Sequence, residues 1–111
     1  MVISVSERGL ALSLDITLRA HGLKAIIHDT KTGMSTLPLR VTSTLIVDGH
    51  VLPKDPKQFV DRLRRQTWRG RLIVLVEDIP GPALLRLRKD GAILIEKPFG
   101  SAELIAQLDG A

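Results

Sequence analysis

Five short apolar runs recur along the chain, each bounded by polar, glycine or proline residues. The clearest extends from Arg71 to Val76, and the others lie at residues 2–5, 24–27, 44–47 and 92–95. Short runs rich in valine and isoleucine predict β-strands, and a run without polar interruption is typical of a strand buried on both faces. The pattern therefore predicts five strands, with residues 71–76 as the most clearly buried one.

Segments with helical spacing of apolar residues separate these strands. Leucines at positions 10, 14 and 18 precede Gly22, which favours a helix ending at that glycine. Asp55 and Pro56 predict the start of another helix, because Asp is a preferred N-cap and Pro fits the first turn. A further helix is predicted over 83–89, ended by Gly91. The last helix is predicted to follow Ser101 as its N-cap, with Leu104, Ile105 and Leu108 facing inward. Residues 36–40 predict only a short or irregular helix, because of Pro38.

Strands and helices thus alternate along the chain. Alternation of this kind predicts βαβ units, and therefore an α/β fold with a parallel sheet. The 111 residues suffice for one hydrophobic core, and no linker or repeat divides them. We expect a single domain over residues 1–111.

Composition excludes several classes of protein. The chain has no cysteine, so disulfides, thiolate metal sites and cysteine nucleophiles are absent. No basic region precedes an apolar stretch at the N-terminus, and no apolar run is long enough to span a bilayer. We therefore expect a cytoplasmic protein that does not enter the membrane.

Basic residues account for the formal net charge of +4. Half of the 16 lysines and arginines lie in two clusters that could bind phosphates or an acidic protein surface. Aromatic residues make up only 3% of the chain, so a base-stacking surface for nucleic acid is not expected. The two clusters comprise Arg62, Arg64, Arg65, Arg69 and Arg71, and Arg86, Arg88 and Lys89.

Asp48 is the first candidate for chemistry. It ends the strand at 44–47, and in parallel α/β sheets the carboxyl ends of the strands form the ligand-binding crevice. Asp48 could equally do no more than start a turn with Gly49. His28 and His50 lack an evident third ligand for a metal, so we expect surface histidines. The chain has no Gly-rich nucleotide-binding motif and no Gly-x-Ser-x-Gly motif, so we do not expect an enzyme.

A second motif changes the interpretation of Asp48. Lys97-Pro98-Phe99 follows directly after the predicted fifth strand. An apolar strand ending in Asp, with a later strand ending in Lys-Pro-Phe, resembles the response-regulator receiver domain of two-component signalling. The resemblance extends over essentially the whole chain. It implies a doubly wound five-stranded parallel sheet of order 2-1-3-4-5, the flavodoxin-like arrangement.

The resemblance implies a role for each motif residue. Asp48 would be the phosphoacceptor, since a carboxylate is already ionised at neutral pH and can act as a nucleophile. Lys97 would pair with the phosphoryl oxygens, and Pro98 would follow a cis peptide bond. The implied partner is a histidine kinase, a phosphotransfer protein or another signalling protein, and a homodimer is also compatible with the family.

The implied metal site is incomplete in this sequence. The family holds Mg²⁺ with an acidic pair after the first strand, and here the corresponding residues are Ser6 and Glu7. Mg²⁺ requires octahedral oxygen ligation, usually with carboxylates. Glu7, Asp48 and a backbone carbonyl would then form a weakened site, so we expect Mg²⁺ to bind weakly and no other cofactor.

The implied conformational switch is also degenerate. The family has a threonine or serine at the end of the fourth strand, where this chain has Val76. Glu77 follows, where the family prefers a small residue, and would bring a negative charge near a phosphate. Leu94 replaces the aromatic residue of the fifth strand. The loop from Asp48 to Pro53 is one residue longer than usual.

Three functional hypotheses remain open at this point. In the first, the chain is an atypical phosphoaccepting receiver, as Asp48 and Lys97 suggest. In the second, it is a pseudo-receiver that binds a signalling protein without phosphorylation, as Ser6, Val76 and Leu94 suggest. In the third, the basic clusters bind nucleic acid. Only their charge supports this hypothesis, since the sequence has no helix-turn-helix pattern.

Overall fold

The fold was analysed in a computed structural model. It describes residues 1–28, 44–49, 52, 55–65, 68, 70–77, 82–89, 91–97 and 100–109. Five parallel strands form one sheet in the order β2-β1-β3-β4-β5. They are β1 (Val2–Ser4), β2 (Ile26–Ile27), β3 (Thr44–Asp48), β4 (Arg71–Val76) and β5 (Ile93–Glu96). The predicted fold class and strand order are confirmed.

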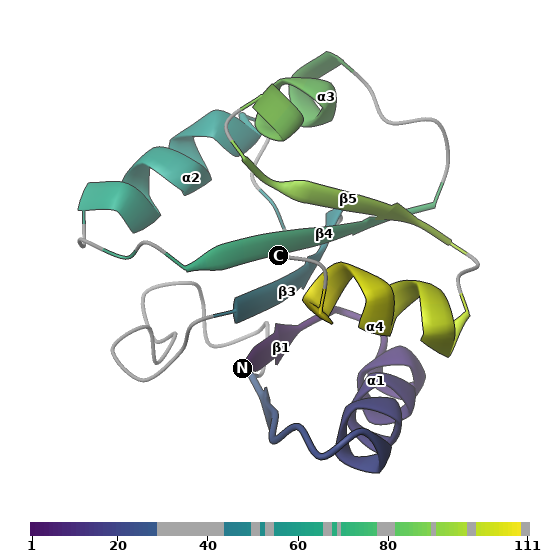
Figure 1. The fold of residues 1–111 in the computed structure, drawn as a ribbon. Coiled ribbons are helices and arrows are strands. Elements are labelled where there is room, and N and C mark those ends of the chain that lie inside the picture. Colours follow the sequence, from purple (N-terminus) through teal and green to yellow (C-terminus); the bar gives the residue numbers. More distant parts are fainter. Residues whose placement is uncertain are drawn as a thin grey trace.

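Helices cover both faces of this sheet (Figure 1). They are α1 (Arg8–Ala20), α2 (Pro56–Arg65), α3 (Pro82–Lys89) and α4 (Ser101–Asp109). In Figure 1, α1 and α4 lie on one side of the sheet and α2 and α3 on the other. This is the doubly wound arrangement. The helix predicted at 36–40 lies outside the described residues.

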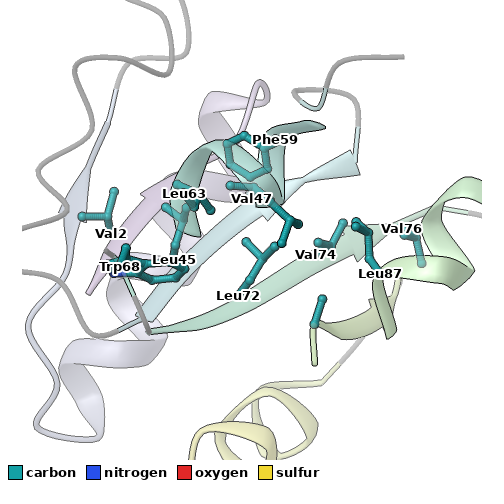
Figure 2. Packing of buried hydrophobic residues seen from close by; sticks show 12 residues of the cluster. Val2, Leu45, Val47, Phe59, Leu63, Trp68, Leu72, Val74, Val76 and Leu87 are labelled. Atoms are coloured by element: carbon teal, nitrogen blue, oxygen red, sulfur yellow. The ribbon is translucent and has the colours of Figure 1, made fainter. Parts of the chain in front are cut away.

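Alternation along the strands divides the core into two clusters. On β3, Leu45 and Val47 contribute to the cluster under α2 and α3, and Ile46 contributes to the cluster under α1 and α4. Successive side chains of a strand point to opposite faces, so an uninterrupted apolar strand supplies both clusters at once. Figure 2 shows Phe59 and Leu63 of α2 and residues of β3 and β4 packed in the first cluster.

Glycine ends two helices by the same geometry. Gly22 has a φ of 78°, its N–H donates to the Arg19 carbonyl, and the Leu23 N–H donates to the Leu18 carbonyl. This pair of hydrogen bonds is the Schellman motif, which requires the left-handed conformation that glycine adopts freely. Gly91, with a φ of 95°, ends α3 through the equivalent bonds.

Helix starts follow the prediction in one case and correct it in another. The Lys57 N–H donates to Asp55 Oδ1 at 3.1 Å, so Asp55 caps α2 as expected. The prediction that Ser101 caps α4 is wrong. Ser101 is the first residue of the helix, and the Leu104 N–H donates to the Gly100 carbonyl at 3.2 Å. Gly100 is therefore the residue at the cap.

Two arginines of the basic clusters stabilise the fold. Arg71 at the start of β4 donates from Nη1 to the Leu108 carbonyl at 2.8 Å, and α4 has no basic residue of its own in its last turn. Arg64 donates to the Trp68 carbonyl at 2.9 Å and lies over the indole ring. Both guanidinium groups are thus engaged within the chain, and less of the basic sequence is available to partners than its composition suggests.

None of the helices in the described residues is long and apolar enough to cross a membrane.

Two leucines of α3 predict very different costs of truncation. Leu87 is fully buried, whereas Leu85 is 42% exposed. We expect Leu87→Ala to lower the free energy of unfolding by about 2–5 kcal/mol, because it leaves a cavity under α3. Leu85→Ala on the same helix should cost less than about 1 kcal/mol. Urea denaturation measures both; equal losses would contradict the packing of α3 on the sheet.

Candidate functional site

The carboxyl edge of the sheet brings together charged residues from three adjacent strands. Asp48 is the last residue of β3, Glu77 follows β4 directly, and Lys97 follows β5 directly. Since β3, β4 and β5 are parallel neighbours, their carboxyl ends lie side by side. Topology alone therefore gathers these three side chains.

Asp48 is the buried member of this group. All residues of β3 are buried, and the Asp48 side chain is only 2% exposed. A buried carboxylate is unfavourable unless hydrogen bonds and an opposite charge compensate it. Asp48 therefore needs a positively charged partner close to the end of β3.

Lys97 supplies that cation. Its backbone N–H donates to the Val76 carbonyl at 2.6 Å, which continues the pairing of β4 with β5 by one residue. From there its Nζ donates to Asp48 Oδ2 at 3.0 Å. The hydrogen bond spans 49 residues of sequence, and the lysine side chain is 16% exposed. The structure thus brings together the two residues on which the resemblance depends.

Glu77 is a second anion on the same lysine. Its Oε1 lies 3.6 Å from Lys97 Nζ, and its side chain is 55% exposed. The sequence predicts Glu77 only as a negative charge near a phosphate. The signal for a contact was present, because Glu77 and Lys97 each follow the end of one of two neighbouring parallel strands. Lys97 therefore lies between a buried and a solvent-facing carboxylate.

Ser6 and Glu7 lie at the neighbouring end of β1. Both are exposed, and Glu7 occupies the N-cap position of α1, where its carbonyl accepts the Ala11 N–H. The Glu7 side chain makes no capping hydrogen bond, so its carboxylate has no structural role at the helix start. In the described residues, no three His, Asp or Glu side chains are grouped as a metal site would need. A magnesium site with Glu7 and Asp48 as ligands therefore stays a prediction.

Val76 and Leu94, at the positions where the resemblance implies a switch, are apolar and contact one hydrophobic cluster. Val76 is buried in the cluster under α2 and α3, and Leu94 packs against that cluster. Leu87 of α3 belongs to the same cluster. Contact between this part of the sheet and α3 thus depends on apolar packing, with no hydroxyl at either switch position.

His28, one of the two expected surface histidines, has a polar partner within the chain. It is half-buried, and its Nδ1 lies 3.3 Å from the Oγ of fully buried Ser4. His28 is therefore a partner for a buried hydroxyl at the ends of β1 and β2. His50, Pro98 and Phe99 lie outside the described residues.

Comparison with known proteins supports the fold. No protein-family model matches the chain, and no curated protein matches it. Among solved structures, it is similar to the chemotaxis protein CheY4 of Vibrio cholerae, with a TM-score of 0.76 and 18% identity over 98% of this chain and 95% of that chain. It is similar to a response regulator receiver protein from Pseudoalteromonas atlantica, with a TM-score of 0.76 and 17% identity over 99% and 95% of the two chains. The chain has the receiver-domain fold over nearly its whole length.

The burial of Asp48 predicts an asymmetry between the two halves of its ion pair. Lys97→Met should lower the free energy of unfolding by roughly 2–4 kcal/mol, because it leaves a buried carboxylate without its cation. Asp48→Asn should cost less than half of that, since Lys97 keeps Glu77 and some access to water. The double variant should be more stable than Lys97→Met alone. Urea denaturation of all three tests the cycle; equal losses from the two single variants would contradict it.

Proposed function

We propose that the chain is an atypical response-regulator receiver domain in two-component or phosphorelay signalling, with Asp48 as the phosphoacceptor. The observation that carries the proposal is the hydrogen bond between Lys97 Nζ and Asp48 Oδ2 at the carboxyl edge of a receiver-type sheet. A carboxylate and an ammonium group from distant parts of the sequence meet at the edge where such folds bind ligands.

The chemistry at this edge is the transfer of a phosphoryl group. A carboxylate oxygen of Asp48 attacks phosphorus, and the bond between phosphorus and the donor's leaving group breaks with its electron pair. The product is an aspartyl phosphate. Lys97, no longer opposite a free Asp48 carboxylate, turns its N–H donors to the phosphoryl oxygens as a charge-assisted contact.

Magnesium would assist this transfer by neutralising charge on the phosphoryl group. Glu7 and Asp48, with a backbone carbonyl, are the residues that would hold it. A site with one carboxylate fewer than the family uses binds the ion weakly. Weak metal binding is thus part of what makes this receiver atypical.

Output would pass through another protein. Histidine kinases, phosphotransfer proteins and other signalling proteins are the partner classes that fit a receiver. The helix α3 ends in the exposed residues Arg86, Arg88 and Lys89, so an acidic surface on the partner fits its charge. Charges of this kind mainly set the rate of association and its dependence on salt.

A phosphorylation-independent binding module is the second candidate function. The contact that favours it is the second anion on Lys97, since the lysine is already paired with Asp48 and Glu77 before any phosphate arrives. Val76 adds to this, because it has no hydroxyl for a phosphoryl oxygen. Nucleic-acid binding gains no such support, since Arg64 and Arg71 hydrogen-bond backbone carbonyls of this chain.

Phosphorylation of Asp48 is tested directly by mass. After incubation with acetyl phosphate and Mg²⁺, we expect the wild-type chain to gain the mass of one phosphoryl group, and Asp48→Asn to gain none. Asp55→Asn, at an exposed aspartate that caps α2, is the matched control and should be phosphorylated like wild type. An unmodified wild-type chain under these conditions would favour the binding module instead.

The missing acid after β1 predicts a gain of metal affinity. Ser6→Asp should strengthen Mg²⁺ binding by roughly tenfold or more, because it adds a third carboxylate ligand. Amide chemical shifts of Glu7 and Asp48 follow the titration. Ser13→Asp, at an exposed position of α1, adds the same charge elsewhere and should leave the affinity unchanged. Tight, saturable binding by the wild-type chain would contradict the interpretation of Ser6.

A further inference from the structure

We infer that Glu77 is a built-in competitor for Lys97, and that it lowers the affinity of the Asp48 site for a phosphoryl group. The inference rests on the proposed function and deepens it, because it names a residue that sets how readily this site accepts phosphate. The juxtaposition that carries it is one ammonium group between two carboxylates, at 3.0 Å from Asp48 and 3.6 Å from Glu77.

The backbone fixes this arrangement. Val76 pairs with Glu96 across β4 and β5, and the Lys97 N–H donates to the Val76 carbonyl. Glu77 and Lys97 are the next residues of the two strands. The lysine side chain must cross the end of β4 to reach Asp48 on β3, so it passes the glutamate on its way. Glu77 therefore lies beside the ammonium group that reaches Asp48.

The contact between Glu77 and Lys97 changes the balance of charge at the site. Before phosphorylation, one positive lysine faces two negative carboxylates. An aspartyl phosphate replaces the single charge of Asp48 with roughly two charges, as phosphoryl groups carry near neutral pH. Lys97 would then have to neutralise the phosphoryl group and Glu77 together. Glu77 both occupies the lysine that the phosphoryl group needs and repels the incoming charge.

The exposure of each partner sets the size of the effect. Asp48 is 2% exposed, but Glu77 is 55% exposed, so water and salt screen its interaction with the lysine. A half-exposed charge a few ångströms from a ligand changes affinity by roughly 3- to 10-fold at low ionic strength. The effect is therefore moderate, and it should depend on salt.

Glu96 provides a matched control. It is an exposed glutamate, the last residue of β5, one residue before Lys97, and it forms no ion pair in the described part of the chain. Glu77→Gln and Glu96→Gln remove the same charge from the same end of the sheet. Only the first removes a carboxylate from Lys97. Glu77→Ala then separates loss of charge from any hydrogen bond that the new amide makes.

The experiment measures the affinity of the whole chain for beryllofluoride in the presence of Mg²⁺, by amide chemical shifts of Asp48 and Lys97. We expect Glu77→Gln and Glu77→Ala to bind the mimic roughly 3- to 10-fold more tightly than wild type at low salt. Glu96→Gln should stay within about twofold of wild type. At about 0.5 M salt, the advantage of the Glu77 variants should shrink.

Failure of the role of Glu77 and failure of the proposed function give different results in this experiment. Equal affinities of the Glu77 and Glu96 variants, at measurable binding, would overturn the role of Glu77 and leave the proposed function intact. A gain that persists at high salt would overturn the electrostatic competition. No binding to wild type or to any variant would overturn the proposed function, and the inference with it. The variant Asp48→Asn checks the location, since it should abolish the shifts.

Discussion

The buried carboxylate of Asp48 is the constraint on which the carboxyl edge of this molecule depends. An ionised group with 2% exposure at the end of a central strand needs a partner within hydrogen-bond distance. Lys97 meets that need from two strands away, and only because β5 ends beside β4 at a fixed register. The charge pair thus links the end of β3 to the residue that follows β5, 49 positions later in the chain.

The sheet beneath this edge is stiff for a simple reason. Its central strands are apolar on both faces, so each strand contributes to the two clusters at the same time. Such interiors are close-packed and do not deform continuously. The switch positions Val76 and Leu94 belong to this packing, together with Leu87 of α3. Val76 and Leu94 both carry apolar side chains, which have no hydroxyl to donate a hydrogen bond.

The positive charge of the chain has more than one use. Arg71 holds the carbonyl end of α4 against the start of β4, and Arg64 stacks on buried Trp68. Arg71 thus supplies the basic group that α4 lacks in its own last turn. Arg86, Arg88 and Lys89 of α3 remain exposed, as do Arg62 and Arg65 of α2. The basic residues therefore divide between contacts that stabilise the fold and charges that face solvent.

The sequence by itself determined the local features of this protein. Apolar runs defined the strands, Gly22 and Gly91 marked helix ends, and Asp55 marked a helix start, because each depends only on residues close in the chain. The resemblance placed Asp48 and Lys97 at one edge, since their strands are parallel. Three features are seen only in the tertiary structure: the distance at which Glu77 faces Lys97, the contact of Ser4 with His28, and the hydrogen bond from Arg71 to the end of α4. Those contacts depend on strand register and side-chain reach across the sheet, which no local pattern encodes.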